Sequence, residues 1–157
     1  MIQAIGVHKK YGDVPALSGV SIAVNAHQAL GVVGPNGAGK SSLLRVLCGL
    51  SHADAGHARL NGYDPLIDPL AARRQLGCLP EHPPLFDLLS GREQLLWVGR
   101  IHDIPETTLA ARINELAAAL DLAEALERRI AGYSKGMRQK LAFAAALLPD
   151  PTILILD

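Results

Sequence analysis

The residues best suited to chemistry form one continuous loop, which reads Gly34-Pro35-Asn36-Gly37-Ala38-Gly39-Lys40-Ser41. This is a complete phosphate-binding pattern of the form G-x-x-x-x-G-K-[ST]. Its glycines allow backbone N–H groups to curl around an anion, and the N-terminus of a following helix adds the positive end of a dipole. In such a loop Lys40 neutralises the β- and γ-phosphates, and the Ser41 hydroxyl ligates Mg²⁺. The pattern predicts a site for a nucleoside triphosphate.

The loop needs a strand before it and a helix after it. Residues 29–33 are a short apolar run and predict the strand, whereas residues 42–47 have helical character. Earlier and later runs at residues 2–7, 20–24 and 57–60 also predict short strands. A turn-rich patch that contains Tyr11 separates the first two of these.

The second half of the chain is predominantly helical. A short helix at residues 69–74 and an apolar run at 76–79 precede a proline-rich bend. Ser90 and Glu93 form a capping-box signature that opens a helix through Trp97, which we expect in the core. Further helices are predicted from residue 105 to 120 and over 141–148. An apolar run then ends at Asp157. A strand that ends in Asp downstream of a phosphate loop is typical of the Walker B motif, whose carboxylate holds Mg²⁺.

Composition and charge give no support for a nucleic-acid-binding, membrane-spanning or secreted protein. Of the 157 residues, 49% are apolar. The 15 basic residues balance 15 acidic ones, so the chain has no net positive charge that would attract nucleic acid. No apolar run reaches membrane-spanning length, and the N-terminus does not resemble a signal peptide. Cys48 with His52 and Cys78 with His82 share one spacing, so zinc is an alternative to simple packing of the cysteines. Their apolar neighbours favour packing.

One further segment makes the combination of motifs specific. It reads Tyr133-Ser134-Lys135-Gly136-Met137-Arg138-Gln139-Lys140. With the phosphate loop and Asp157, it resembles the nucleotide-binding subunit of ATP-binding-cassette (ABC) transporters, in the exporter branch whose permease is a separate polypeptide. The resemblance implies an α/β fold: a P-loop NTPase core, in which a parallel sheet joins N-terminal antiparallel strands, plus an inserted helical subdomain. It implies a core at residues 1–80, a helical subdomain at 81–148 and a return to the core at 149–157.

The same resemblance assigns roles. Tyr11 would stack on adenine, and Ser42 would add a phosphate contact to residues 34–41. Ser134 and Gly136 would touch the γ-phosphate bound by the opposite subunit. Lys40, Glu81 and Asp157 would be catalytic, and the Mg²⁺ ligands would be Ser41, Asp157 and Glu81.

Simpler roles compete with these, and the sequence also departs from the family pattern. Tyr11 could be a surface aromatic of a turn, and Ser134 could simply cap a helix. Lys135 and Met137 replace signature residues, and Glu81 stands where the family has glutamine.

The resemblance implies an ATPase that uses ATP and Mg²⁺, forms a dimer with a second such subunit and drives an integral membrane permease. It would lie in the cytoplasm on the inner face of the membrane and bind no nucleic acid. A GTPase or a small-molecule kinase, and a soluble cassette protein acting on ribosomes or DNA, are the other classes. The family's glutamate after Walker B would follow residue 157, so we expect a truncated chain that binds nucleotide without hydrolysis.

Overall fold

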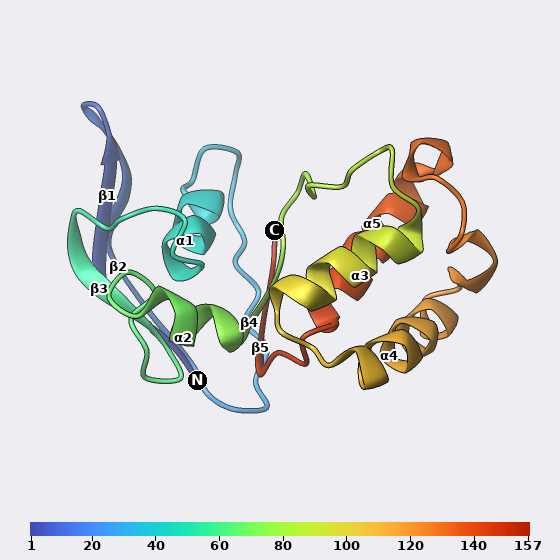
Figure 1. Ribbon diagram of the computed structural model, residues 1–157. Coiled ribbons are helices and arrows are strands. Elements are labelled where there is room, and N and C mark those ends of the chain that lie inside the picture. The colour runs from blue at the N-terminus through green and yellow to red at the C-terminus, as the bar shows by residue number, and fades with distance from the viewer. The chain divides into compact units, whose positions relative to one another are not determined.

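The computed structural model describes residues 1–157, and the chain divides into two compact units. The first unit comprises Met1–Leu76 together with Asp157, and the second comprises Gly77–Leu156. Figure 1 shows the strands β1 to β3 in the first unit and the helices α3 to α5 in the second.

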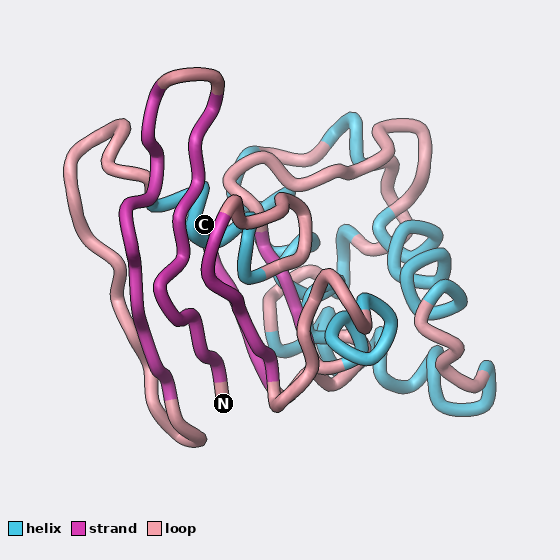
Figure 2. Tube along the Cα trace, turned by 90° about the vertical axis from the view of Figure 1, so that its left-hand side faces the viewer, coloured by secondary structure: helices cyan, strands magenta, loops and turns pink.

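An antiparallel sheet of three strands forms the first unit's framework, with β1 (Ile2–Tyr11) between β2 (Val14–Val24) and β3 (Ala55–Leu60). The three strands run side by side in Figure 2. A two-residue turn at Gly12, whose φ is +60°, joins β1 to β2. The predicted strands are therefore confirmed, and they are longer than expected, so Tyr11 is the last residue of a strand.

Two helices belong to this unit. The helix α1 (Lys40–Leu47) follows the phosphate loop as predicted and buries Leu43, Val46 and Leu47. The helix α2 (Pro69–Arg74) begins at a proline, a residue suited to the first helical turn. Its bounds and those of β4 (Leu76–Leu79) match the predicted segments at 69–74 and 76–79.

The strand expected at residues 29–33 does not form. These residues carry no strand or helix, and Val33 is 92% exposed. A strand exists only with a ladder partner, and no other strand of this chain pairs with the segment. The strand predicted from the apolar composition is therefore wrong here, because pairing with another strand decides whether a strand forms.

The second unit is a helical assembly with its own core. It contains α3 (Gly91–Ile101), α4 (Glu106–Ala119) and α5 (Lys135–Leu147), with two short 3₁₀ helices, η1 (Ala123–Ala125) and η2 (Ile130–Gly132). Its fully buried large side chains come from all three long helices and their connections: Leu95, Leu109, Ile113, Leu122, Leu126, Ile130, Leu141 and Leu148. After α5, the strand β5 (Ile153–Leu156) pairs with β4 in a two-stranded sheet.

The predictions for this unit are confirmed in part, and α5 begins at Lys135, before the expected start at residue 141. Ser90 and Glu93 form the predicted capping box at the start of α3. Trp97 does not lie in the core as expected: it is 46% exposed and packs edge-on against Phe86, with ring centroids 5.1 Å apart. Leu95, two residues earlier, takes the buried position of the helix. None of the helices combines the length and the apolar character that crossing a bilayer requires.

Candidate nucleotide-binding site

The phosphate loop has a backbone that only glycine adopts readily. Gly37 and Gly39 have φ values of +81° and +87°, in the left-handed region. A Cβ atom added to Gly39 would lie 2.2 Å from the carbonyl oxygen of Ala16, so no larger residue fits there. Gly39 is also the N-cap of α1, where the loop's free N–H groups meet the positive end of the helix dipole. This is the local geometry that anion binding requires.

Lys40 is held against the loop's own backbone. Its ammonium group donates hydrogen bonds to the carbonyl oxygens of Gly34 and Pro35, both at 2.8 Å. The charge therefore lies against the backbone of the loop. The Lys40 ammonium group would therefore lie close to a phosphate that the loop binds.

Two predicted metal ligands meet although 116 positions separate them in the sequence. The Ser41 hydroxyl donates a hydrogen bond to Oδ1 of Asp157 at 3.1 Å. Both are oxygen donors, which Mg²⁺ prefers, and Mg²⁺ ordinarily takes only one or two carboxylates and keeps several waters. A hydroxyl beside a single carboxylate, next to a phosphate loop, fits this ion.

Tyr11 lies beside the first turns of α1. Tyr11 is 47% exposed, and hydrogen bonding to the side chains of Ser42 and then Ser51 holds the pKa of Tyr11 below its usual value. Arg45 lowers this pKa further. The structure thus brings the predicted base-stacking residue next to Ser42, a predicted phosphate contact.

The other predicted residues belong to the second unit. The Ser134 hydroxyl accepts a hydrogen bond from the backbone N–H of Met137 at 3.2 Å, so Ser134 does cap α5. A Cβ atom on Gly136 would meet no atom within 4 Å, which leaves the backbone of this turn open. Glu81 lies exposed after β4. The roles of these three residues at a nucleotide stay predictions.

Sequence reasoning missed Lys9 and Asp54. Lys9 Nζ lies 3.0 Å from Oδ1 of Asp54 and 5.6 Å from the centre of the Tyr11 ring. No motif links residues 45 positions apart in a β-strand and a loop, so only the folded chain reveals the pair.

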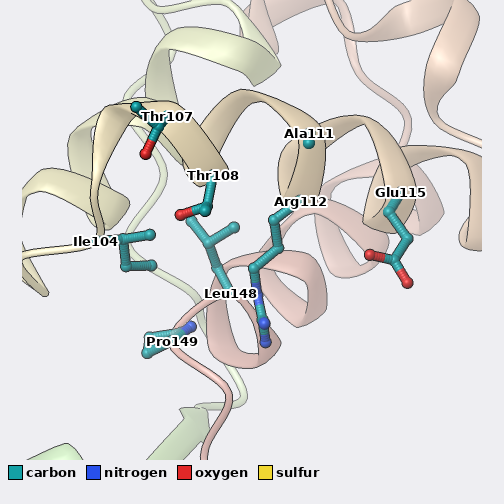
Figure 3. Close-up of a pocket in the computed structure, with 8 residues that line it drawn as sticks. All are labelled: Ile104, Thr107, Thr108, Ala111, Arg112, Glu115, Leu148 and Pro149. Carbon is teal, nitrogen blue, oxygen red and sulfur yellow. The ribbon is translucent and has the colours of Figure 1, made fainter.

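A separate cavity of about 510 Å³ lies in the second unit (Figure 3). It is lined by Ile104, by one face of α4, and by Leu148 and Pro149, which follow α5. Arg112 extends from α4 toward these two residues, donates to the carbonyl oxygen of Leu147 at 3.0 Å and pairs with Asp150 at 3.2 Å. The arginine therefore ties α4 to the turn after α5, and the cavity contains none of the predicted site residues.

Comparison with known proteins gives one consistent answer. The family described as "ABC transporter" matches residues 17–157. The daunorubicin resistance ATP-binding protein DrrA3 of Streptomyces coeruleorubidus is 40% identical over 97% of this chain and 48% of its own length. The ABC transporter ATP-binding protein NatA of Bacillus subtilis is 33% identical over 92% of this chain and 59% of its own length.

Solved structures agree with this result. A structure described as the ATP-binding subunit of an ABC transporter superposes with a TM-score of 0.92 and 29% identity, over all of this chain and 65% of that one. The α/β fold expected for this family is therefore confirmed. The chain spans about half the length of several curated relatives that it matches. On the family match and these similarities, the chain belongs to the ABC transporter family.

Proposed function

We propose that this chain binds Mg·ATP as part of the ATP-hydrolysing subunit of an exporter-type ABC transporter. The observation that carries the proposal is the hydrogen bond between Ser41 and Asp157 at 3.1 Å, directly after a glycine-constrained phosphate loop. A P-loop protein holds its Mg²⁺ with the serine of the loop and the Walker B aspartate, and these are the two residues that meet here.

The chain's own groups divide the work. Backbone N–H groups at residues 34–41 bind phosphate oxygens, and Lys40 neutralises charge that develops during phosphoryl transfer. Ser41 and Asp157 would hold Mg²⁺, which supplies charge neutralisation between the β- and γ-phosphates when bound. Tyr11 offers an exposed ring face for the base, and Glu81 would add a carboxylate as a direct or water-mediated ligand.

The proposed partners are a second copy of the subunit and an integral membrane permease. Ser134 and Gly136, at the open N-terminal turn of α5, would contact the nucleotide bound by the second copy. An exposed apolar group on the second unit supports contact with another protein: Trp97 and Ile101 lie one turn apart on α3, and Phe86 packs on Trp97. A subunit with these partners would work in the cytoplasm, on the inner face of the membrane.

The names of the relatives support the exporter assignment. Several are described as daunorubicin or doxorubicin resistance ATP-binding proteins, including DrrA of Mycobacterium tuberculosis, which is 35% identical over 97% of this chain. We therefore propose export, with the permease choosing the substrate.

Titration calorimetry tests the metal arrangement. ATP affinity is measured with Mg²⁺ and with a chelator, for the parent and for the variants Ser41→Ala and Asp157→Asn. We expect Mg²⁺ to strengthen ATP binding in the parent and to do so much less in either variant, because each variant loses one proposed oxygen ligand. Asp13→Asn, an exposed acid in the turn after β1, is the matched control and should behave as the parent. An equal gain from Mg²⁺ in the parent and both variants would refute the proposal.

A further inference from the structure

We infer that Lys9 and Asp54 are positioning residues for Tyr11, which hold its ring so that a nucleotide base stacks only on the face opposite Lys9. The inference rests on the proposed function in one respect, namely that Tyr11 receives the base. It assigns two residues that neither a motif nor the family match identifies.

Asp54 fastens the end of β1 by three contacts. Its carboxylate accepts a hydrogen bond from Lys9 Nζ at 3.0 Å and another from the backbone N–H of Lys10 at 2.6 Å. Its own N–H donates to the carbonyl oxygen of His8 at 2.8 Å. Three consecutive residues immediately before Tyr11 are therefore tied to one residue of the loop that precedes β3.

Lys9 is unusually enclosed for a lysine. Its side chain is only 14% exposed, whereas lysine side chains generally extend into water. The ammonium lies over the Tyr11 ring, 5.6 Å from the ring centre, within the range of a cation–π contact. One face of the ring is thus covered by a held cation, and a base must approach the other face.

The hydroxyl end of the Tyr11 ring also has hydrogen-bonding neighbours. The hydroxyls of Ser42 and Ser51 hydrogen-bond to the Tyr11 oxygen and lower the pKa of this residue. The hydrogen bond that Lys9 donates also lowers the pKa of the Asp54 carboxyl. A ring oriented beforehand loses less conformational freedom when a ligand stacks on it, which favours binding.

A purely structural role would be to join β1 to the loop before β3. The two roles predict different ligand dependences, because stacking involves only the base, whereas the phosphate loop binds any polyphosphate. Tripolyphosphate, which has no base, is therefore the discriminating probe beside Mg·ATP.

The variants are Lys9→Met and Asp54→Asn, with Lys10→Met as the matched control. Lys10 is the neighbouring exposed lysine, and its side chain makes none of these contacts. Its replacement changes the net charge by the same amount as Lys9→Met. We expect both variants to lose affinity for ATP by about two- to fivefold, the weight of one exposed cation–π contact. Affinity for tripolyphosphate should not change, and Lys10→Met should match the parent for both ligands.

Two further measurements keep the test decisive. Lys9→Arg keeps the charge over the ring and should retain ATP affinity, so it serves where Lys9→Met fails to fold. In a Tyr11→Ala background, Lys9→Met should have no further effect on ATP binding, because the ring it positions is gone.

Each other outcome overturns the inference in a recognisable way. Equal losses of affinity for ATP and for tripolyphosphate would show that Lys9 and Asp54 only join β1 to the loop before β3. Unchanged ATP affinity in Lys9→Met and Asp54→Asn, while Tyr11→Ala binds ATP more weakly, would reject the pair and leave the proposed function intact. If Tyr11→Ala itself binds ATP like the parent, the stacking role of Tyr11 fails, and the inference fails with it.

Discussion

Lys40, Ser41 and Asp157 show how few side chains the proposed chemistry needs. The lysine is held by two carbonyl oxygens of its own loop, and the serine is held by the aspartate. Phosphoryl transfer requires mainly positioning and charge stabilisation from a protein, so groups that hydrogen bonds fix in advance are well suited to it.

Lys40→Ala should abolish ATP turnover and strongly weaken nucleotide binding in the protein that carries this sequence. The change removes the cation at the loop, and losing one such charge-stabilising donor typically costs about a hundred- to thousandfold in rate. Phosphate release and ATP affinity are the measurements, with Lys10→Ala as the control. A near-normal rate in Lys40→Ala would contradict the assignment.

Tyr11→Ala should lower nucleotide affinity by about 1–3 kcal/mol, the usual contribution of a base stacked on an aromatic ring. Tyr11→Phe should lose little, since the ring face is retained. Stacking accepts either purine, so ATP and GTP should differ only modestly in the parent. Equilibrium binding of both nucleotides measures this, and equal affinities in Tyr11→Ala and the parent would exclude stacking.

At the scale of elements, capping residues determine where helices begin. Ser90 accepts from the N–H of Glu93 at 3.2 Å, and Glu93 Oε2 accepts from the N–H of Ser90 at 2.7 Å. At α5 only one such bond forms, from the N–H of Met137 to the Ser134 hydroxyl. The reciprocal bonds at Ser90 explain why the start of α3 follows from a short sequence signature.

Ser90→Ala should lower the free energy of unfolding by about 0.5–2 kcal/mol, the usual cost of losing a serine cap. Urea denaturation measures the change. Ser18→Ala, an exposed serine of β2, is the control and should stay within about 0.5 kcal/mol of the parent. If Ser90→Ala is as stable as Ser18→Ala, the capping box does not stabilise α3.

The same box should make stability depend on acid. The backbone N–H of Ser90, followed by its hydroxyl, lowers the pKa of Glu93. A folded-state pKa below the unfolded value gives stability that is complete above the unfolded pKa and is lost as the pH falls through the folded one. The stability difference between the parent and Glu93→Gln should therefore shrink below about pH 4. A difference that is the same at pH 7 and pH 3 would show that the charge plays no part.

At the scale of the whole molecule, the two units divide the predicted site. The phosphate loop, Tyr11 and Asp157 belong to the first unit, whereas Ser134 and Gly136 belong to the second. In the proposed dimer, these two residues would complete the site of the other copy, so that each site draws on two chains.

Mixing two inactive variants tests this composite site. Lys40→Ala removes the phosphate loop's cation, and Ser134→Arg blocks the N-terminus of α5. A mixed dimer would then keep one intact site, so ATP turnover in the mixture should exceed that of either variant alone. Turnover should also rise more than linearly with protein concentration. No gain on mixing would contradict independent composite sites.

Short-range chemistry explains what the sequence determined by itself. The glycine pattern of the phosphate loop, the Ser90 capping box and the bounds of α2 follow from residues within a few positions of one another. Propensity, capping and turn conformation act over that range, so they can be inferred from the residues alone. The order of these motifs also carried the resemblance that the family match confirmed.

The tertiary structure decided what depends on distant neighbours. Residues 29–33 form no strand because no ladder partner pairs with them, and Trp97 is half exposed because Leu95 takes the buried position of α3. The contact of Lys9 with Asp54 joins positions 45 apart, and no local rule reports which side chains will meet across such a separation. Burial and pairing depend on the whole fold, because each needs a surface that another part of the chain supplies.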